Sequence, residues 1–97
     1  MAYARITKFT RATPEQIARV VSEVDGAEGP PPGVPSTGLK LIVNEEEGTV
    51  IFVGFFETEE DLRTGDAALR QMDPPGGVPG TRASVDMGEI RVEREVS

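Results

Sequence analysis

The stretch Val50-Ile51-Phe52-Val53-Gly54-Phe55-Phe56 predicts a β-strand that is apolar on both of its sides. Successive side chains of a strand point to opposite faces of the sheet. The alternation places three apolar side chains on each face: Ile51, Val53 and Phe55 on one, and Val50, Phe52 and Phe56 on the other. Because a contiguous apolar patch rarely stays in water, each face of this strand needs its own cover.

The segment before this strand predicts its hairpin partner. Gly38–Asn44 (GLKLIVN) has the composition of a strand, and the acidic segment up to Gly48 forms the turn into a strand over Val50–Glu57. The glutamates at positions 45–47 are consecutive residues of a turn, so their side chains do not converge on one ion. We therefore expect a solvated turn and no metal site.

The amino-terminal part predicts a strand followed by a helix. Tyr3–Thr10 is rich in β-branched and aromatic residues. Thr13, Pro14 and Gln16 together form a helix start with a capping box. An apolar stripe then follows at helical spacing up to Gly26, where we expect the helix to end: Ile17, Val20, Val21 and Val24.

Thr58 predicts the start of a second helix, with three acidic residues in its first turn. The apolar stripe of this helix contains Leu62, Leu69 and Met72, and Gly65 lies on the same stripe. Glycine costs about 1 kcal/mol relative to alanine inside a helix. We therefore expect Gly65 to allow a close approach to the sheet.

Two proline- and glycine-rich loops follow the helices. Residues 25–37 and 73–81 contain PPPGVPST and PPGGVPGT, each placed between a helix and the next strand. The likeness fits an internal β-α-β repeat, and it equally fits a chance similarity between two loops of common composition.

The carboxyl-terminal segment predicts a long last strand over Arg82–Val96. Its apolar residues lie at odd positions up to Met87 and at even positions from Ile90. One extra residue at or near Gly88 restores the alternation, so we expect a β-bulge there.

The order β-α-β-β-α-β predicts an α+β, ferredoxin-like fold of one domain over residues 1–97, with a four-stranded antiparallel sheet and both helices on one face. The other face is left bare, and the strand at 50–56 makes it apolar. Packing two sheets face to face covers it. We therefore expect a homodimer.

Composition excludes many functions. The 97 residues include 17 acidic and 10 basic side chains, for a formal net charge of −7, and no Cys, His or Trp. Thiol nucleophiles, disulfides, ordinary zinc sites and a histidine proton shuttle are thereby excluded. The negative charge is unfavourable for nucleic acid and for anionic lipid. Without a long apolar run or a secretory signal pattern, we expect a cytoplasmic protein that does not contact membranes.

The segments YARITKF (3–9), VIFVGFFETEEDL (50–62) and RVEREV (91–96) resemble the antibiotic biosynthesis monooxygenase-like proteins of the dimeric α/β-barrel superfamily. The resemblance implies a ferredoxin-like subunit that pairs sheet to sheet, with a ligand cavity between the sheet and its helices or loops. Active members oxidise polycyclic aromatic or quinol-like molecules with oxygen and without metal or flavin, so no cofactor is expected. Family oxygenases often carry Asn and Trp where this chain has Phe52 and Phe56, and haem-degrading relatives need a His that this chain lacks.

The candidate site residues follow from that cavity. If Phe52 and Phe56 face the cavity, alternate residues of the first strand point to the same region. These are Tyr3, Arg5, Thr7 and Phe9. Tyr3 is a candidate proton donor, and Arg5 a candidate for stabilising anionic charge. Phe52, Phe56, Thr7 and Phe9 are the candidate ligand-binding residues.

Structural roles explain the same residues. Tyr3 suits a strand start, Arg5 suits an ion pair across an acidic dimer interface, and Phe52 and Phe56 suit a dimer core. Arg82 and Asp86 are further, weaker site candidates.

Three functions remain open. The first is a small homodimeric monooxygenase-like domain, ligand-binding or non-catalytic, with an apolar pocket for a small apolar or aromatic ligand. The second is a cofactor-independent oxygenase of aromatic or quinol-like molecules, with Tyr3 and Arg5 assisting. The third is a purely structural or interaction module.

Overall fold

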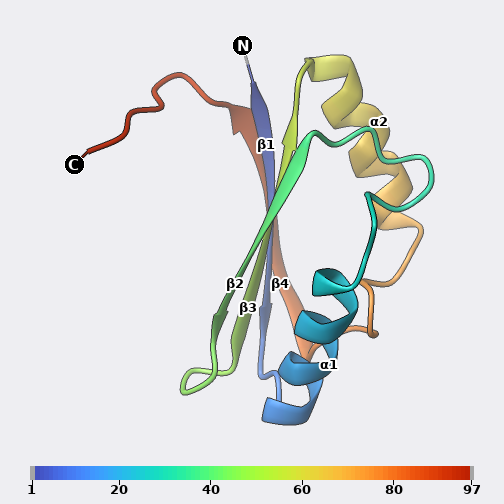
Figure 1. Ribbon diagram of the computed structural model, residues 1–97, viewed down its shortest axis with the longest axis vertical. Coiled ribbons are helices and arrows are strands. Elements are labelled where there is room, and N and C mark those ends of the chain that lie inside the picture. Colours follow the sequence, from blue (N-terminus) through green and yellow to red (C-terminus); the bar gives the residue numbers. More distant parts are fainter. Residues whose placement is uncertain (1, 97) are drawn as a thin grey trace.

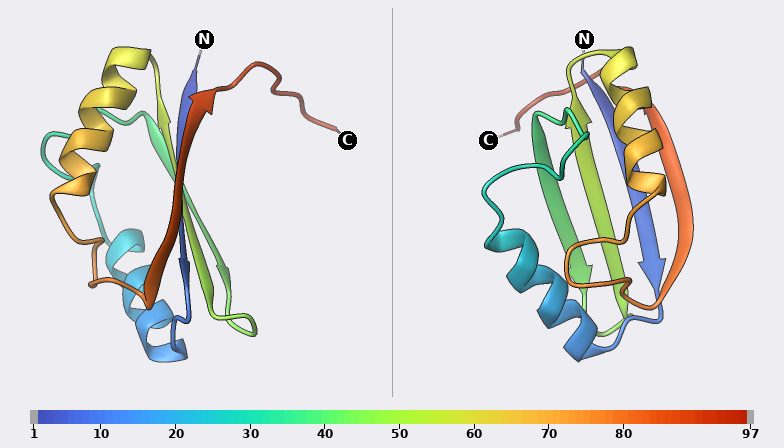
Figure 2. Two further views of the ribbon diagram at one scale, coloured as in Figure 1. Left: turned by 180° about the vertical axis from the view of Figure 1, so that it is seen from behind. Right: turned by 90° about the vertical axis from the view of Figure 1, so that its right-hand side faces the viewer.

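The computed structural model describes residues 2–96 and has six elements in the predicted order (Figure 1). They are β1 (Tyr3–Thr10), α1 (Pro14–Asp25), β2 (Gly38–Asn44), β3 (Thr49–Phe56), α2 (Glu59–Arg70) and β4 (Thr81–Glu89). The strands form one sheet in the order β2-β3-β1-β4, and all neighbours are antiparallel. Both helices lie on the same side of this sheet (Figure 2). The predicted ferredoxin-like α+β arrangement is confirmed.

The helix starts agree with the sequence. Thr13 accepts a hydrogen bond from the Gln16 backbone N–H, and the Gln16 side chain accepts one from the Thr13 backbone N–H, which completes the capping box. The side chain of Thr58 accepts a hydrogen bond from the Asp61 backbone N–H and so caps the start of α2.

Strand β1 separates two faces of the sheet residue by residue. Arg5, Thr7 and Phe9 are buried under the helices and loops, whereas Ile6 and Lys8 are exposed on the other side. We call the second side the open face. Its apolar residues come from three strands: Ile6, Ile42, Ile51, Val53 and Phe55.

The core on the helix side consists of two clusters. One gathers around Phe9, Ile17 and Val50 near α1, and the other around Phe56 and Leu62 near α2. Gly65 makes the second cluster possible, because a Cβ at this position would lie 2.5 Å from Cε2 of Phe56. The predicted close approach of Gly65 to the sheet is confirmed.

The last strand is shorter than predicted. It ends at Glu89, which pairs with Tyr3, the first residue of β1. Because β4 is an edge strand with β1 as its neighbour, it has no partner beyond that point. Ile90 still donates a backbone hydrogen bond to Ala2, after which the chain leaves the sheet on the side away from the helices (Figure 1). The prediction of a strand up to Val96 was wrong.

The irregularity of β4 also lies elsewhere than predicted. The register shifts at Ala83, because Lys8 pairs with Ser84 and Phe9 pairs with Arg82. Gly88 pairs regularly with Ala4. The extra residue turns Arg82 to the helix side, where its guanidinium carbon lies 5.6 Å from the centroid of the Phe9 ring. The switch of apolar positions after Gly88 reflects the end of the strand rather than a bulge.

The two proline-rich loops occupy equivalent places in the fold. Each follows a helix of 12 residues and precedes a strand. A 12-residue helix is about 18 Å long, whereas an eight-residue strand is about 26 Å long, so each loop continues over sheet that its helix leaves uncovered. Gly33 and Gly77 stand at corresponding positions of the two loops, and both have a positive φ. The neighbouring valines differ, since Val34 is buried and Val78 is exposed.

Candidate functional site

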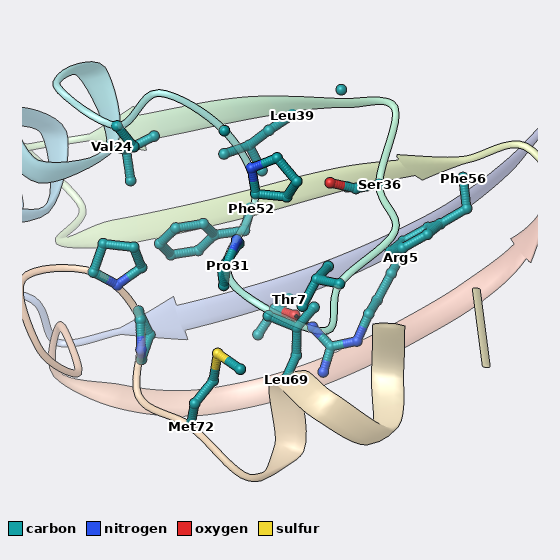
Figure 3. Close-up of a pocket in the computed structure, with 18 of the residues that line it drawn as sticks. Arg5, Thr7, Val24, Pro31, Ser36, Leu39, Phe52, Phe56, Leu69 and Met72 are labelled. Atoms are coloured by element: carbon teal, nitrogen blue, oxygen red, sulfur yellow. Dashed lines mark hydrogen bonds between the residues drawn. The ribbon is translucent and has the colours of Figure 1, made fainter. Parts of the chain in front are cut away.

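A cavity of about 650 Å³ lies between the helix-covered side of the sheet and the two proline-rich loops (Figure 3). It lies where these loops, rather than the two short helices, cover the sheet. The loops contribute prolines to the wall: Pro30, Pro31, Pro74 and Pro75. Val24, at the end of α1, Leu69, at the end of α2, and Met72, just after it, also belong to the apolar wall.

Aromatic side chains form much of the floor. Phe52 is only partly buried and packs edge-on against Phe9, with ring centroids 5.8 Å apart and an interplanar angle of 76°. Phe56 is buried at the other end of the same strand. Gly54, between them, adds no side chain to the floor next to its cross-strand partner Arg5. The cavity is therefore broad and apolar, with the buried Arg5 beside its floor and the exposed Arg82 also in its wall.

Arg5 is the buried charge of this site. Its side chain is 6% exposed, and its Nε donates to Oδ1 of Asp66 at 2.9 Å. Its Nη1 donates to the Thr7 hydroxyl oxygen at 2.8 Å. Nη2 is buried and has no hydrogen-bond partner within residues 2–96. The guanidinium thus keeps donor capacity that the described residues leave unused.

Asp66 connects Arg5 to the surface of α2. Arg70, one turn later, donates from its Nε to both carboxylate oxygens of Asp66, at 3.0 and 2.9 Å. Burial acts to raise the pKa of Asp66, but the hydrogen bonds and positive charges of Arg5 and Arg70 outweigh it and hold the pKa below its ordinary value. Asp66 is therefore ionised at neutral pH and shared between two guanidinium groups.

The structure brings most of the predicted site residues together. Arg5, Thr7, Phe9, Phe52 and Phe56 all line the cavity, and so does Arg82.

Two other candidates lie elsewhere. Tyr3 packs against the cluster of Val34, Phe56 and Leu62 and does not line the cavity. Asp86 pairs with Ile6 and belongs to the open face.

Sequence reasoning missed Asp66 and did not identify the loop residues that form the wall. A signal for Asp66 existed, because it stands next to Gly65 on the apolar stripe of α2, where an acid needs a buried partner. The corresponding signal for the wall was the pair of similar loops, each following a helix too short to cover its strand.

Comparisons with known proteins bear on the fold. No protein-family model matches the sequence, and no curated protein matches it. A crystal structure of a protein from Chloroflexus aurantiacus J-10-fl, provisionally assigned as an antibiotic biosynthesis monooxygenase, is similar over 100% of both chains, with a TM-score of 0.59 and 12% sequence identity. This protein therefore shares the fold of that structure. Within residues 2–96, neither helix has the length and apolar character needed to cross a membrane.

Proposed function

We propose that this protein binds a small apolar or aromatic molecule in the cavity beneath its two proline-rich loops, and that it does so as a homodimer. The observation that carries the proposal is the cavity itself. Its volume of about 650 Å³ is in the range of small-molecule sites, roughly 300–1,000 Å³. A predominantly apolar wall with a few polar groups is also typical of such sites.

The open face supports the homodimer. Ile6 is 39% exposed and Ile42 is 50% exposed, and three further apolar residues of β3 lie between them on the same face. Sheet-to-sheet packing with a second copy covers this patch without disturbing the cavity, which opens on the opposite side of the sheet. Sedimentation velocity at micromolar concentration tests the assembly, and a single species with the mass of one chain would contradict it.

A neutral fluorescent probe tests the binding site directly. N-phenyl-1-naphthylamine becomes brighter in apolar cavities, and we expect saturable enhancement with the wild-type protein. Gly54→Leu should weaken binding at least tenfold, because the new side chain fills the floor. A Cβ at Gly54 lies 3.5 Å from the nearest atom of Phe56, which is an ordinary contact, so the variant should fold.

Ala18→Leu is the matched control. It also introduces a leucine side chain, but at an exposed position of α1 outside the cavity wall. Its affinity for the probe should equal that of the wild type. Equal affinity of Gly54→Leu and the wild type would place the bound probe elsewhere and contradict the proposal.

A second candidate function is cofactor-independent oxidation of an electron-rich aromatic. Arg5 favours it, since a buried guanidinium in the cavity wall stabilises the phenolate form of such a substrate. Tyr3, which lies outside the wall, gives it no support. Oxygen uptake with a panel of naphthols and quinols separates the two functions, because only the oxygenase consumes oxygen and loses turnover in Arg5→Ala.

A further inference from the structure

The unused donors of Arg5 indicate what kind of ligand the cavity takes. A guanidinium has five N–H groups, of which the hydrogen bonds to Asp66 and Thr7 use two. Nη2 has no partner within residues 2–96, although the side chain is only 6% exposed. A buried charged donor without an acceptor is costly, so an acceptor supplied from the cavity would stabilise this arrangement.

The charges around Arg5 leave it incompletely neutralised. Within residues 2–96, Asp66 is the one acidic partner of Arg5, and it also accepts two hydrogen bonds from Arg70. The acidic residues of the cavity wall, Glu28 and Asp73, are exposed, so water screens them. The buried end of the cavity is therefore cationic, and its exposed wall carries charges of both signs, because Arg82 lines it as well.

Thr7 supplies a second donor beside Arg5. Its hydroxyl oxygen accepts from Nη1 of Arg5, which leaves the hydroxyl hydrogen free to donate within the described part of the chain. Thr7 is buried and lines the cavity. A guanidinium N–H next to a hydroxyl donor suits the two oxygens of a carboxylate.

We propose that the ligand is an amphipathic carboxylate whose head group binds Arg5 and Thr7 and whose apolar body lies against Phe52. This inference rests on the proposed binding function. Figure 3 shows the guanidinium of Arg5 beside Thr7 and Leu69, with Phe52 and Met72 farther along the cavity. One guanidinium and one hydroxyl match a singly charged carboxylate better than a doubly charged phosphate, which requires more donors.

Access to Nη2 requires a small movement of the wall. Nη2 is covered in the structure, so the ligand head must displace a neighbouring side chain to reach it. Leu69, which lies beside the guanidinium in Figure 3, is half-buried in this wall and is the side chain that must move.

Two probes of nearly equal shape test the proposal: 2-naphthoate and the neutral 2-naphthalenemethanol. Isothermal titration calorimetry on the wild-type protein should give an affinity for 2-naphthoate at least tenfold higher. Arg5→Met should abolish this preference while still binding the alcohol, because methionine keeps the apolar volume and removes the charge. Thr7→Val should reduce the preference about threefold to tenfold.

Arg63→Met is the matched control. Arg63 is an exposed arginine of the same helix, but it pairs with Glu59 and does not line the cavity. Its preference for 2-naphthoate should equal that of the wild type.

The outcomes separate this inference from the binding function. Binding of both probes with equal affinity by the wild type would overturn the carboxylate and leave the binding function standing. Failure to bind either probe would overturn both. If Arg5→Met does not fold, Thr7→Val and the two-probe comparison on the wild type still decide the matter.

Discussion

The two faces of the sheet consist of the same four strands, yet they present different chemistry. On the helix side, β1 contributes Arg5 and Thr7, buried polar groups that line the cavity. On the open face, β1 and β3 contribute Ile6, Ile51 and Val53, which the chain itself covers only in part. Apolar residues on both faces of one strand therefore indicate that each face is covered in a different way. Only the face with buried polar groups has the features of a ligand site.

The largest expected effect comes from two neighbouring phenylalanines on opposite faces. Phe56→Ala should lower the free energy of unfolding by about 3–5 kcal/mol, because it leaves a hole in a fully buried cluster. Phe55→Ala should cost the isolated chain much less and should mainly weaken the dimer. Urea unfolding at low protein concentration measures the first effect, and sedimentation measures the second. Equal losses of stability at low concentration would contradict the distinction between the faces.

A charge placed on the open face tests whether a second copy of the chain packs against it. Val53→Lys should raise the dimer dissociation constant about a hundredfold, or about 2–3 kcal/mol, because the ammonium group becomes buried without a partner. The circular dichroism spectrum should stay unchanged. Val21→Lys is the control, since Val21 is an exposed valine on α1. Dissociation by both variants alike would show that the effect is not specific to the open face.

The close contact on the helix side should be sensitive to a single methyl group. Gly65→Ala should destabilise the protein by about 1–3 kcal/mol, because the Cβ would overlap the Phe56 ring. Helix propensity alone favours alanine by about 1 kcal/mol, so the expected sign is opposite to that of an exposed helix site. Ala67→Gly, at an exposed position of α2, measures the propensity term by thermal unfolding. A more stable Gly65→Ala protein would contradict the close packing.

The smallest expected effect is the pH dependence that Asp66 contributes. Its pKa in the folded protein lies below the ordinary value of 3.8. The stabilisation is therefore fully present above pH 3.8 and is lost as the pH falls through the lowered folded pKa. As the pH falls from 7 to 2, the free energy of unfolding should decrease less in Asp66→Asn than in the wild type.

Asp86→Asn provides the comparison from the open face. Asp86 makes no ion pair within residues 2–96. The free energy of unfolding of this variant should therefore fall in acid as much as that of the wild type. If the free energy of unfolding of Asp66→Asn falls in acid as much as that of the wild type, Asp66 does not contribute to the pH dependence of stability.

Much of the fold was predictable because its signals are local. Thr13 and Thr58 mark helix starts through hydrogen bonds that span three residues. The parity of Arg5, Thr7, Phe52 and Phe56 placed these residues on one face, because strand geometry alternates with every residue. Gly65 indicates a close contact with the sheet, because glycine destabilises a helix relative to alanine unless it allows such an approach.

The candidate site was only partly predictable because its decisive contacts are distant in sequence. Arg5 and Asp66 are 61 positions apart, and no local pattern states that they meet. Tyr3 lies outside the cavity wall because it packs against the cluster of Val34, Phe56 and Leu62. The position of Arg82 in the wall depends on a bulge at Ala83 that only the pairing with β1 reveals.

The sequence by itself determined the six elements, their order and the two apolar faces of β3, because caps, turns and side-chain alternation act over a few residues. Only the tertiary structure decided where β4 ends, since an edge strand pairs only as far as its neighbour extends. It also decided that two short helices leave a cavity under the proline-rich loops, and that Arg5 enters its wall with unused donors. These features arise from the fit between elements, which no single segment encodes.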